Sequence, residues 1–190
     1  GNEPLRGAIS EGLSRGGGGV IHLYCGDGKG KTTAAMGLAM RSAGRGNRVV
    51  VAQFLKNADS GERAALSLLP SILLLDAPEI MKFDFQMTPE EKKAERERQT
   101  ALFDAAVTLA SRERAGLLVL DEMCSAVNTG MVSLERVTEF LDHMPAGLEV
   151  VLTGRDPAPE LERRADYITE MRKCKHPYDR GVAPRLGVEW

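Results

Sequence analysis

Residues 26–33 read Gly26-Asp27-Gly28-Lys29-Gly30-Lys31-Thr32-Thr33, and they separate two apolar segments. Residues 20–24 before them are typical of a strand, and residues 33–40 after them are typical of a helix. A glycine-rich loop between a strand and a helix points backbone N–H groups at phosphate oxygens, and the helix N-terminus adds partial positive charge. We therefore predict that residues 26–33 bind the phosphates of a nucleotide, with the Lys31 ammonium as a fixed charge and the Thr32 hydroxyl as a ligand for Mg²⁺.

The loop departs from the usual phosphate-loop pattern at its first position. Cys25 stands where the first glycine is expected, and a glycine follows one place later at Gly26. A glycine-rich turn without a ligand is the alternative interpretation. We disfavour it, because the strand, the loop, the Lys31-Thr32 pair and the helix all indicate a nucleotide site.

Composition and charge limit the classes of protein that this sequence can represent. The chain has 190 residues, of which 43% are hydrophobic and 27% are charged, and its formal net charge is −2. These values are typical of one globular domain, and they predict no nucleic-acid or membrane partner. No apolar run approaches the roughly 18 residues that span a bilayer, and residues 1–19 have no signal-peptide core. The three cysteines are far apart, which argues against a disulfide framework or a zinc cluster, so we expect a cytoplasmic protein.

Strand-like and helix-like segments alternate along the chain. Four glycines at 16–19 predict a flexible N-terminal segment over residues 1–19, followed by one domain over residues 20–190. Thr88, Pro89 and Glu91 form a helix start, with Thr88 as the N-cap of a capping box. The alternation predicts an α/β fold with a mainly parallel central sheet. The expected strands are residues 20–24, 48–55, 72–75, 117–120, 148–152 and 167–171, and the expected helices are residues 33–40, 89–114, 133–141 and 157–165.

A second nucleotide-site signal lies where the apolar residues 117–120 are followed by Asp121-Glu122. This pattern resembles a Walker B strand, whose terminal carboxylate reaches the metal ion above the phosphate loop. We expect this strand to neighbour the strand before the loop, and Thr32, Asp121 and Glu122 to hold Mg²⁺ or Mn²⁺. The alternative is a solvated acid at a strand end, which the phosphate loop upstream makes less favourable.

A nucleotide site does not by itself define a reaction. Glu122 could orient a water molecule and Arg155 could act as an arginine finger, so a nucleotide hydrolase or a small-molecule kinase stays open. A nucleotide-dependent binding protein is a further alternative. The net charge and the lack of interleaved basic and aromatic residues do not favour it.

Several motifs in register resemble one enzyme family, the ATP:corrinoid adenosyltransferases of the phosphate-loop type. The family's loop has the same shifted glycine, and the similarity extends over about residues 20–190. This resemblance implies a P-loop NTPase-like (RecA-like) three-layer fold. The further matching motifs are Gln53-Phe54-Leu55-Lys56, Gly61-Glu62-Arg63, Leu120-Asp121-Glu122, Leu152-Thr153-Gly154-Arg155, residues 165–171 and residues 175–182.

The resemblance also implies an activity. Such enzymes transfer the 5′-deoxyadenosyl group of ATP to cobalt(I) of a corrinoid, which is cobalamin or cobyrinic acid a,c-diamide, and release triphosphate. It further implies a homodimer, a flavin-type electron donor, and catalytic roles for Lys31 and Glu122. The nucleotide contacts implied are those of Gly26, Asp27, Gly28, Lys29, Gly30, Lys31, Thr32, Thr33, Gln53, Lys56, Glu62, Arg155 and His176.

The corrinoid side is where the sequence departs from its better-known relatives. They place a Phe and a Trp after the third strand to displace the lower axial ligand of the corrinoid. The only tryptophan of this chain is Trp190, and the corresponding segment reads Lys82-Phe83-Asp84-Phe85-Gln86-Met87. We predict that Phe83 and Phe85 take over this role, since both face one way in an extended chain. The alternative is that they only cap the core.

Overall fold

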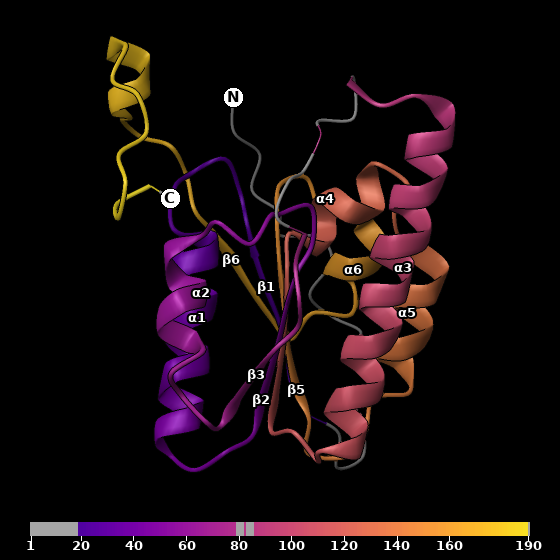
Figure 1. Cartoon of the computed structure of the whole chain (residues 1–190). Coiled ribbons are helices and arrows are strands. Elements are labelled where there is room, and N and C mark those ends of the chain that lie inside the picture. The colour runs from indigo at the N-terminus through magenta and orange to yellow at the C-terminus, as the bar shows by residue number, and fades with distance from the viewer. Residues whose placement is uncertain (1–18, 79–81, 83–85, 190) are drawn as a thin grey trace.

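A single sheet of six strands organises the chain, in the order β3-β2-β4-β5-β1-β6. The computed structural model describes residues 19–78, 82 and 86–189 (Figure 1). All neighbouring strands run parallel, which confirms the predicted parallel sheet. The strands are β1 (Ile21–Cys25), β2 (Val49–Gln53), β3 (Ile72–Leu74), β4 (Leu117–Asp121), β5 (Glu149–Thr153) and β6 (Tyr167–Glu170).

Helices cover both faces of the sheet, so the fold has the three layers expected. Two helices lie on one face and the others on the opposite face (Figure 1). The first group is α1 (Lys31–Gly44) and α2 (Gly61–Leu66), and the second is α3 (Pro89–Arg112), α4 (Met123–Asn128), α5 (Leu134–Asp142) and α6 (Pro159–Glu162). The chain after β6, residues 171–189, is called the C-terminal arm here, and it contains a 3₁₀ turn, η2 (Pro177–Arg180). Among the described residues, no helix is both long enough and apolar enough to cross a membrane.

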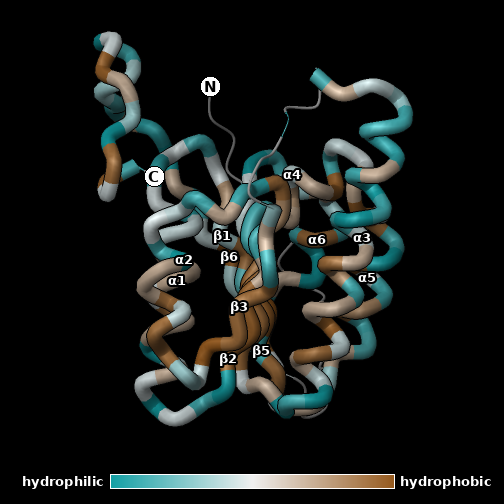
Figure 2. The backbone as a smooth tube through the Cα atoms, viewed as in Figure 1, coloured by the Kyte–Doolittle hydropathy of each residue, from teal (hydrophilic) through white to brown (hydrophobic). Residues whose placement is uncertain are grey.

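The central strands are buried on both sides, as their unbroken apolar sequence predicts. Every residue of β2 and β4 is buried. Hydrophobic residues are accordingly concentrated along the strands and on the helix faces beside them (Figure 2). The edge strand β6 differs, since all four of its residues are exposed.

The predicted helix starts at Thr88 and Ser133 are confirmed, whereas other predicted bounds are wrong. The helix predicted over 33–40 spans Lys31–Gly44, and several other segments are shorter than predicted. The side chains of Thr88 and Ser133 accept hydrogen bonds from the first turns of α3 and α5. Strand β2 ends at Gln53, because the chain turns at Leu55, where φ is 54°. The predicted helix 157–165 shrinks to the four residues of α6. Two helices of six residues, α2 and α4, were not predicted, because so few residues do not establish a helical period.

The expectation that β1 and β4 are neighbours is wrong, because β5 lies between them. The strand that ends in Asp121 pairs with β2 and β5. Helix α1 connects the two regions, because it follows the loop after β1 and packs against β1, β5, β4 and β2. The first turn of α1 therefore faces the end of β4 although their strands do not pair.

Leu118 at the centre of β4 provides a test of this core. It is fully buried, whereas Leu68 is 80% exposed. We predict that Leu118→Ala lowers the free energy of unfolding by about 2–5 kcal/mol, because it removes buried methyl groups and leaves a cavity. Leu68→Ala, the matched control, stays within about 0.5 kcal/mol of the parent protein. Urea denaturation of both variants measures the difference, and equal losses would contradict the assignment of the core.

Candidate active site

The shifted glycines of the loop have a steric reason. The chain that leaves β6 passes directly over the loop, and Gly28 N donates a hydrogen bond to Met171 O at 2.6 Å. A Cβ at Gly26 would lie 2.3 Å from that carbonyl oxygen, and a Cβ at Gly28 would lie 2.6 Å from it. Gly26 also has φ of 101°. Glycine is therefore needed at 26 and 28, while Cys25 simply ends β1 in the core.

Lys31 lies folded over the loop at the start of α1. Its Nζ donates to Gly28 O at 2.9 Å. Burial lowers the pKa of Lys31, and the positive charge of Arg155 lowers it further, whereas Glu122 and Asp27 act in the opposite direction. These four side chains therefore share one electrostatic environment around the loop.

Asp121 is the centre of a buried hydrogen-bond network. Its Oδ1 accepts from Thr32 Oγ1 at 2.9 Å and from Thr153 Oγ1 at 2.7 Å. Its Oδ2 accepts from Lys56 Nζ at 2.6 Å and from Gln53 Nε2 at 3.2 Å. The side chain is fully buried, so these four donors replace the water that an ionised carboxylate requires.

Gln53 extends this network from β2 to the edge of the sheet. Its Nε2 also donates to Glu62 Oε1 at 3.0 Å, and its Oε1 accepts from Arg63 Nη1 at 3.1 Å. Arg63 Nη2 in turn donates to Leu75 O at 2.7 Å, just beyond β3. The amide of Gln53 thereby fixes α2 and the end of β3 relative to Asp121.

Glu122 differs from its neighbour in exposure and in backbone geometry. It is partly exposed, and its φ of 61° places it in the left-handed region. This conformation costs roughly 1–2 kcal/mol in a non-glycine residue. A hydrogen bond of 2.9 Å from Glu122 N to Thr153 Oγ1 holds it there. Its carboxylate accepts from Ser125 Oγ at 2.9 Å and acts on the charge of Lys31.

The two cysteines near the loop are poor candidates for a nucleophile. Burial raises the pKa of the Cys25 thiol above its usual value. Burial also raises the pKa of Cys124 to about 12. A nucleophilic cysteine requires a lowered pKa, so both thiols act as small core side chains.

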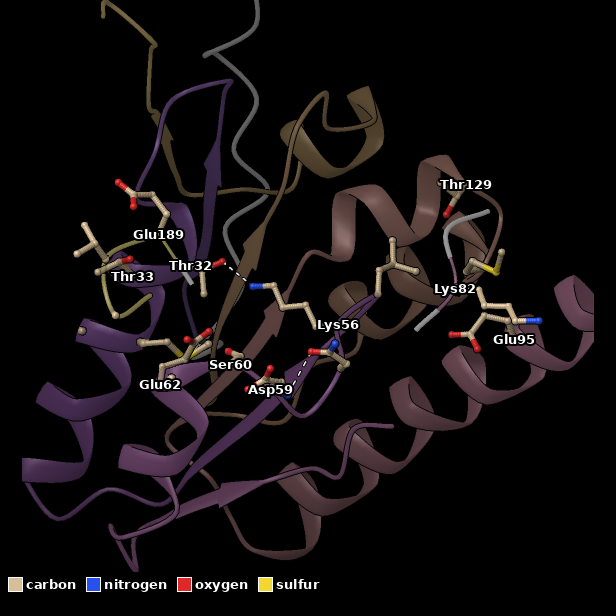
Figure 3. A pocket seen from close by; sticks show the side chains of 18 of the residues that line it. Thr32, Thr33, Lys56, Asp59, Ser60, Glu62, Lys82, Glu95, Thr129 and Glu189 are labelled. Carbon is tan, nitrogen blue, oxygen red and sulfur yellow. Dashed lines mark hydrogen bonds between the residues drawn. The ribbon is translucent and has the colours of Figure 1, made fainter. Parts of the chain in front are cut away.

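A cavity of about 1060 Å³ opens beside Thr32 and Thr33 (Figure 3). We call it the groove. One wall is formed by α1, with Met36 and Met40, and another by the turn after β2, with Lys56. Lys82 and Met87 also line it. Phe83 and Phe85, which stand between these two residues in the sequence, lie outside the described residues. The remaining lining residues are Gly37, Leu55, Asn57, Asp59, Ser60, Gly61, Glu62, Glu95, Thr129, Met131, Gly187, Val188 and Glu189.

The structure brings together most of the predicted site residues. Arg155 and Lys29 are exposed beside the loop, and Asp27 Oδ1 accepts from Lys173 N at 2.9 Å, the largest cause of its lowered pKa. His176 instead caps η2, where its Nδ1 accepts from Tyr178 N at 3.1 Å, so a role at the nucleotide stays a prediction.

Sequence reasoning missed three parts of this site. Thr153 and Arg63 stand within the matching motifs, but neither was assigned a function from the sequence; for Thr153, a polar residue at the end of a buried strand is a usable signal. It also missed the lining by Met36, Met40 and the C-terminal residues 187–189. Their place depends on how distant segments meet, and no local pattern predicts that.

The contrast between Asp121 and Glu122 gives a matched pair of variants. Asp121→Asn replaces an acceptor oxygen by an NH₂ group and leaves Lys56 without its counter-ion. We predict a loss of about 3–5 kcal/mol in the free energy of unfolding, as for other broken buried pairs. Glu122→Gln keeps the shape and the contact with Ser125, so its loss is below about 1 kcal/mol. Thermal denaturation of both proteins measures the contrast, and equal stability of the two variants would contradict the role given to Asp121.

Comparison with known proteins identifies the family of the chain. The model of the family ATP:corrinoid adenosyltransferase BtuR/CobO/CobP matches residues 17–190. The chain is 34% identical over 173 residues to the corrinoid adenosyltransferase of Pseudomonas aeruginosa, covering 90% of this chain and 84% of that protein. It is 31% identical over 173 residues to the corrinoid adenosyltransferase CobA of Salmonella typhimurium, covering 90% and 86%.

Among solved structures, the chain is similar to the KaiC-like protein PH0186 from Pyrococcus horikoshii OT3. That similarity has a TM-score of 0.49 at 18% sequence identity and covers 81% of this chain and 71% of the other. The family match extends over nearly the whole chain and includes the loop, the Asp121-Glu122 strand end and the C-terminal motifs. On that basis the chain belongs to the ATP:corrinoid adenosyltransferase family.

Proposed function

We propose that the reaction of this family, transfer of the 5′-deoxyadenosyl group of ATP to cobalt(I) of a corrinoid, takes place where the groove meets residues 26–33. The observation that carries the proposal is the position of the groove. It opens directly beside Thr32 and Thr33, at the N-terminus of α1. A nucleotide whose phosphates lie on the loop can therefore present its ribose to a second substrate in the groove.

The transfer is a single displacement at carbon. The electron pair of cobalt(I) forms the Co–C5′ bond, and the bond from C5′ to the α-phosphate oxygen breaks, so that triphosphate leaves with that electron pair. No proton is transferred in this step, and a general base is not required. The corrinoid supplies the nucleophile, while the protein supplies binding and orientation.

The loop stabilises the leaving group. Negative charge increases on the α-phosphate oxygen as the bond breaks, and fixed N–H donors and cations nearby stabilise it. Residues 26–33 supply the backbone donors, Lys31 supplies an ammonium group, and Arg155 lies close enough to act on the same charges. The negative charge of Glu122 opposes the lowering of the Lys31 pKa that burial causes, and so favours the charged ammonium.

A divalent cation fits the oxygen atoms at this site. The Thr32 hydroxyl is held by the carboxylate of Asp121, and Glu122 lies beside it in sequence. Hydroxyl and carboxylate oxygens are the ligands that Mg²⁺ and Mn²⁺ prefer. We propose that Thr32 would ligate the metal, that Asp121 would position the Thr32 hydroxyl for it, and that Glu122 would hold it directly or through water. The bound cation would neutralise charge on the triphosphate.

Further parts of the proposal rest on the family resemblance. They are a homodimer and a flavin-type electron donor for reduction of cobalt. The cysteine usage supports a cytoplasmic location, and the glycines at 16–19 support an N-terminal segment of residues 1–19 ahead of the catalytic domain. The acceptor is cobalamin or cobyrinic acid a,c-diamide, and a comparison of the two as substrates distinguishes them.

The product of ATP tests the proposed reaction against its rivals. The protein is incubated with MgATP and chemically reduced cobalamin, and both the cobalamin spectrum and the phosphate products are followed. The proposal expects adenosylcobalamin and triphosphate in equal amounts. Orthophosphate or ADP without a change of the corrinoid spectrum would instead support a hydrolase or a kinase.

Lys31→Ala tests the phosphate loop itself. Hydrogen bonds to charged groups contribute about 1.5–3 kcal/mol each, so we predict that ATP affinity falls by about 10- to 150-fold. Lys93→Ala, an exposed lysine on α3, is the control and leaves the affinity unchanged. Calorimetric titration with ATP measures both. An affinity of the Lys31 variant within twofold of the parent protein would remove the loop from the site.

Phe83 and Phe85 are tested by two assays on the double alanine variant. If they displace the lower axial ligand, they assist reduction to cobalt(I) and have no part in the transfer itself. We predict nearly normal activity with cobalt(I) made in advance, and a large loss when the assay starts from cobalt(II) and a mild flavin-type reductant. Loss of core packing would lower both activities alike. Equal residual activity in both assays, from folded protein, would show that the displacing group lies elsewhere.

A further inference from the structure

The ammonium of Lys56 lies between two oxygen atoms suited to a divalent cation. Its Nζ donates to Thr32 Oγ1 at 3.0 Å (Figure 3). The same Nζ donates to Asp121 Oδ2 at 2.6 Å. The side chain is only 27% exposed. A positive charge therefore already lies at the Thr32–Asp121 pair before any nucleotide or metal is present.

We propose that Lys56 is a built-in cation that holds the metal position in the nucleotide-free protein and must leave it when a metal nucleotide binds. This inference rests on the proposed function only in that the site binds ATP with a divalent cation. It requires neither a corrinoid nor the transfer step.

The network leaves no room for both cations. The carboxylate of Asp121 already accepts four hydrogen bonds, two of them from Thr32 and Lys56. A divalent ion on Thr32 Oγ1 would lie within a few ångströms of the ammonium, at a site that is only partly exposed. Like charges repel there more strongly than in water, by about fourfold at an effective dielectric constant of 20. Metal binding at Thr32 therefore requires that Lys56 move away.

The side chain of Lys56 has space to move into the groove. Lys56 follows Leu55, whose positive φ turns the chain out of β2, and it lines the groove. Leu55 N is held by Gln99 Oε1 at 3.4 Å, which fixes the start of the turn and leaves the lysine stem to rotate. The carboxylate of Glu62 on α2 lines the same groove and interacts electrostatically with Lys56. It is one acceptor for the displaced ammonium, and a bound triphosphate would be a second.

The consequence is coupling between metal and nucleotide. Without ATP, a metal ion must displace Lys56 and gains few ligands in return. With ATP, the phosphates offer ligands to the metal and new partners to the ammonium, so the same displacement is favourable. The lysine thereby disfavours a metal-loaded site that lacks a nucleotide.

The test measures Mn²⁺ binding to the full chain without nucleotide, by the electron paramagnetic resonance signal of free Mn²⁺. We expect Lys56→Met to bind Mn²⁺ at least tenfold more tightly than the parent protein, and its melting temperature to rise more on addition of Mn²⁺. Adding ATP should raise Mn²⁺ affinity less in this variant than in the parent. Lys82→Met is the matched control, because Lys82 lines the same groove but pairs with Glu91; its Mn²⁺ affinity should equal that of the parent.

A second variant covers the case in which Lys56→Met does not fold. Lys56→Gln keeps a donor for Asp121 but removes the charge, and it should also bind Mn²⁺ more tightly without nucleotide. Circular dichroism establishes that each variant is folded. Nucleotide-free Mn²⁺ affinity equal to or weaker than that of the parent, in a folded Lys56 variant, would overturn the proposal even if adenosyl transfer is intact.

Discussion

The buried carboxylate of Asp121 is the constraint on which the rest of the site depends. An ionised group without contact to water must be compensated by hydrogen bonds or by opposite charge. Here the donors come from the start of α1, the end of β2, the turn after it and the end of β5. Four separate elements are thereby fixed around one point, and the phosphate loop is fixed with them because Thr32 is one of its residues.

Because of this constraint, the two adjacent carboxylates Asp121 and Glu122 have different roles. Asp121 is fully buried and its acceptor positions are occupied, so it serves to position Thr32 and Lys56. Glu122 is partly exposed, has a strained backbone and faces the charges of the loop. Strain of this kind persists only where the surrounding structure maintains it, and it is concentrated at functional sites. The groove beside the loop then provides space for the second substrate that this chemistry needs.

The sequence predicted those parts of the structure that local chemistry determines. The loop, the buried strands and the caps at Thr88 and Ser133 each have a local signal, and the structure contains all of them. The position of β5 between β1 and β4 has no such signal, because strand order depends on contacts between distant segments. The same holds for the groove, which residues from α1, the turn after β2 and the C-terminal arm form together. The glycines at 26 and 28 were visible in the sequence as a pattern. The steric reason for them became apparent only in the structure, where the backbone at Met171 lies against both positions.

A structure of the protein with MgATP bound tests the central claim most directly, because it shows which way the nucleotide lies. The account predicts phosphate oxygens on the N–H groups of residues 26–33, the metal on Thr32 Oγ1 with Asp121 behind it, and C5′ of the ribose facing the groove. Such a geometry leaves C5′ open to attack from the groove side. A nucleotide that lies away from the loop, or whose C5′ is turned from the groove and covered by protein, would contradict the account.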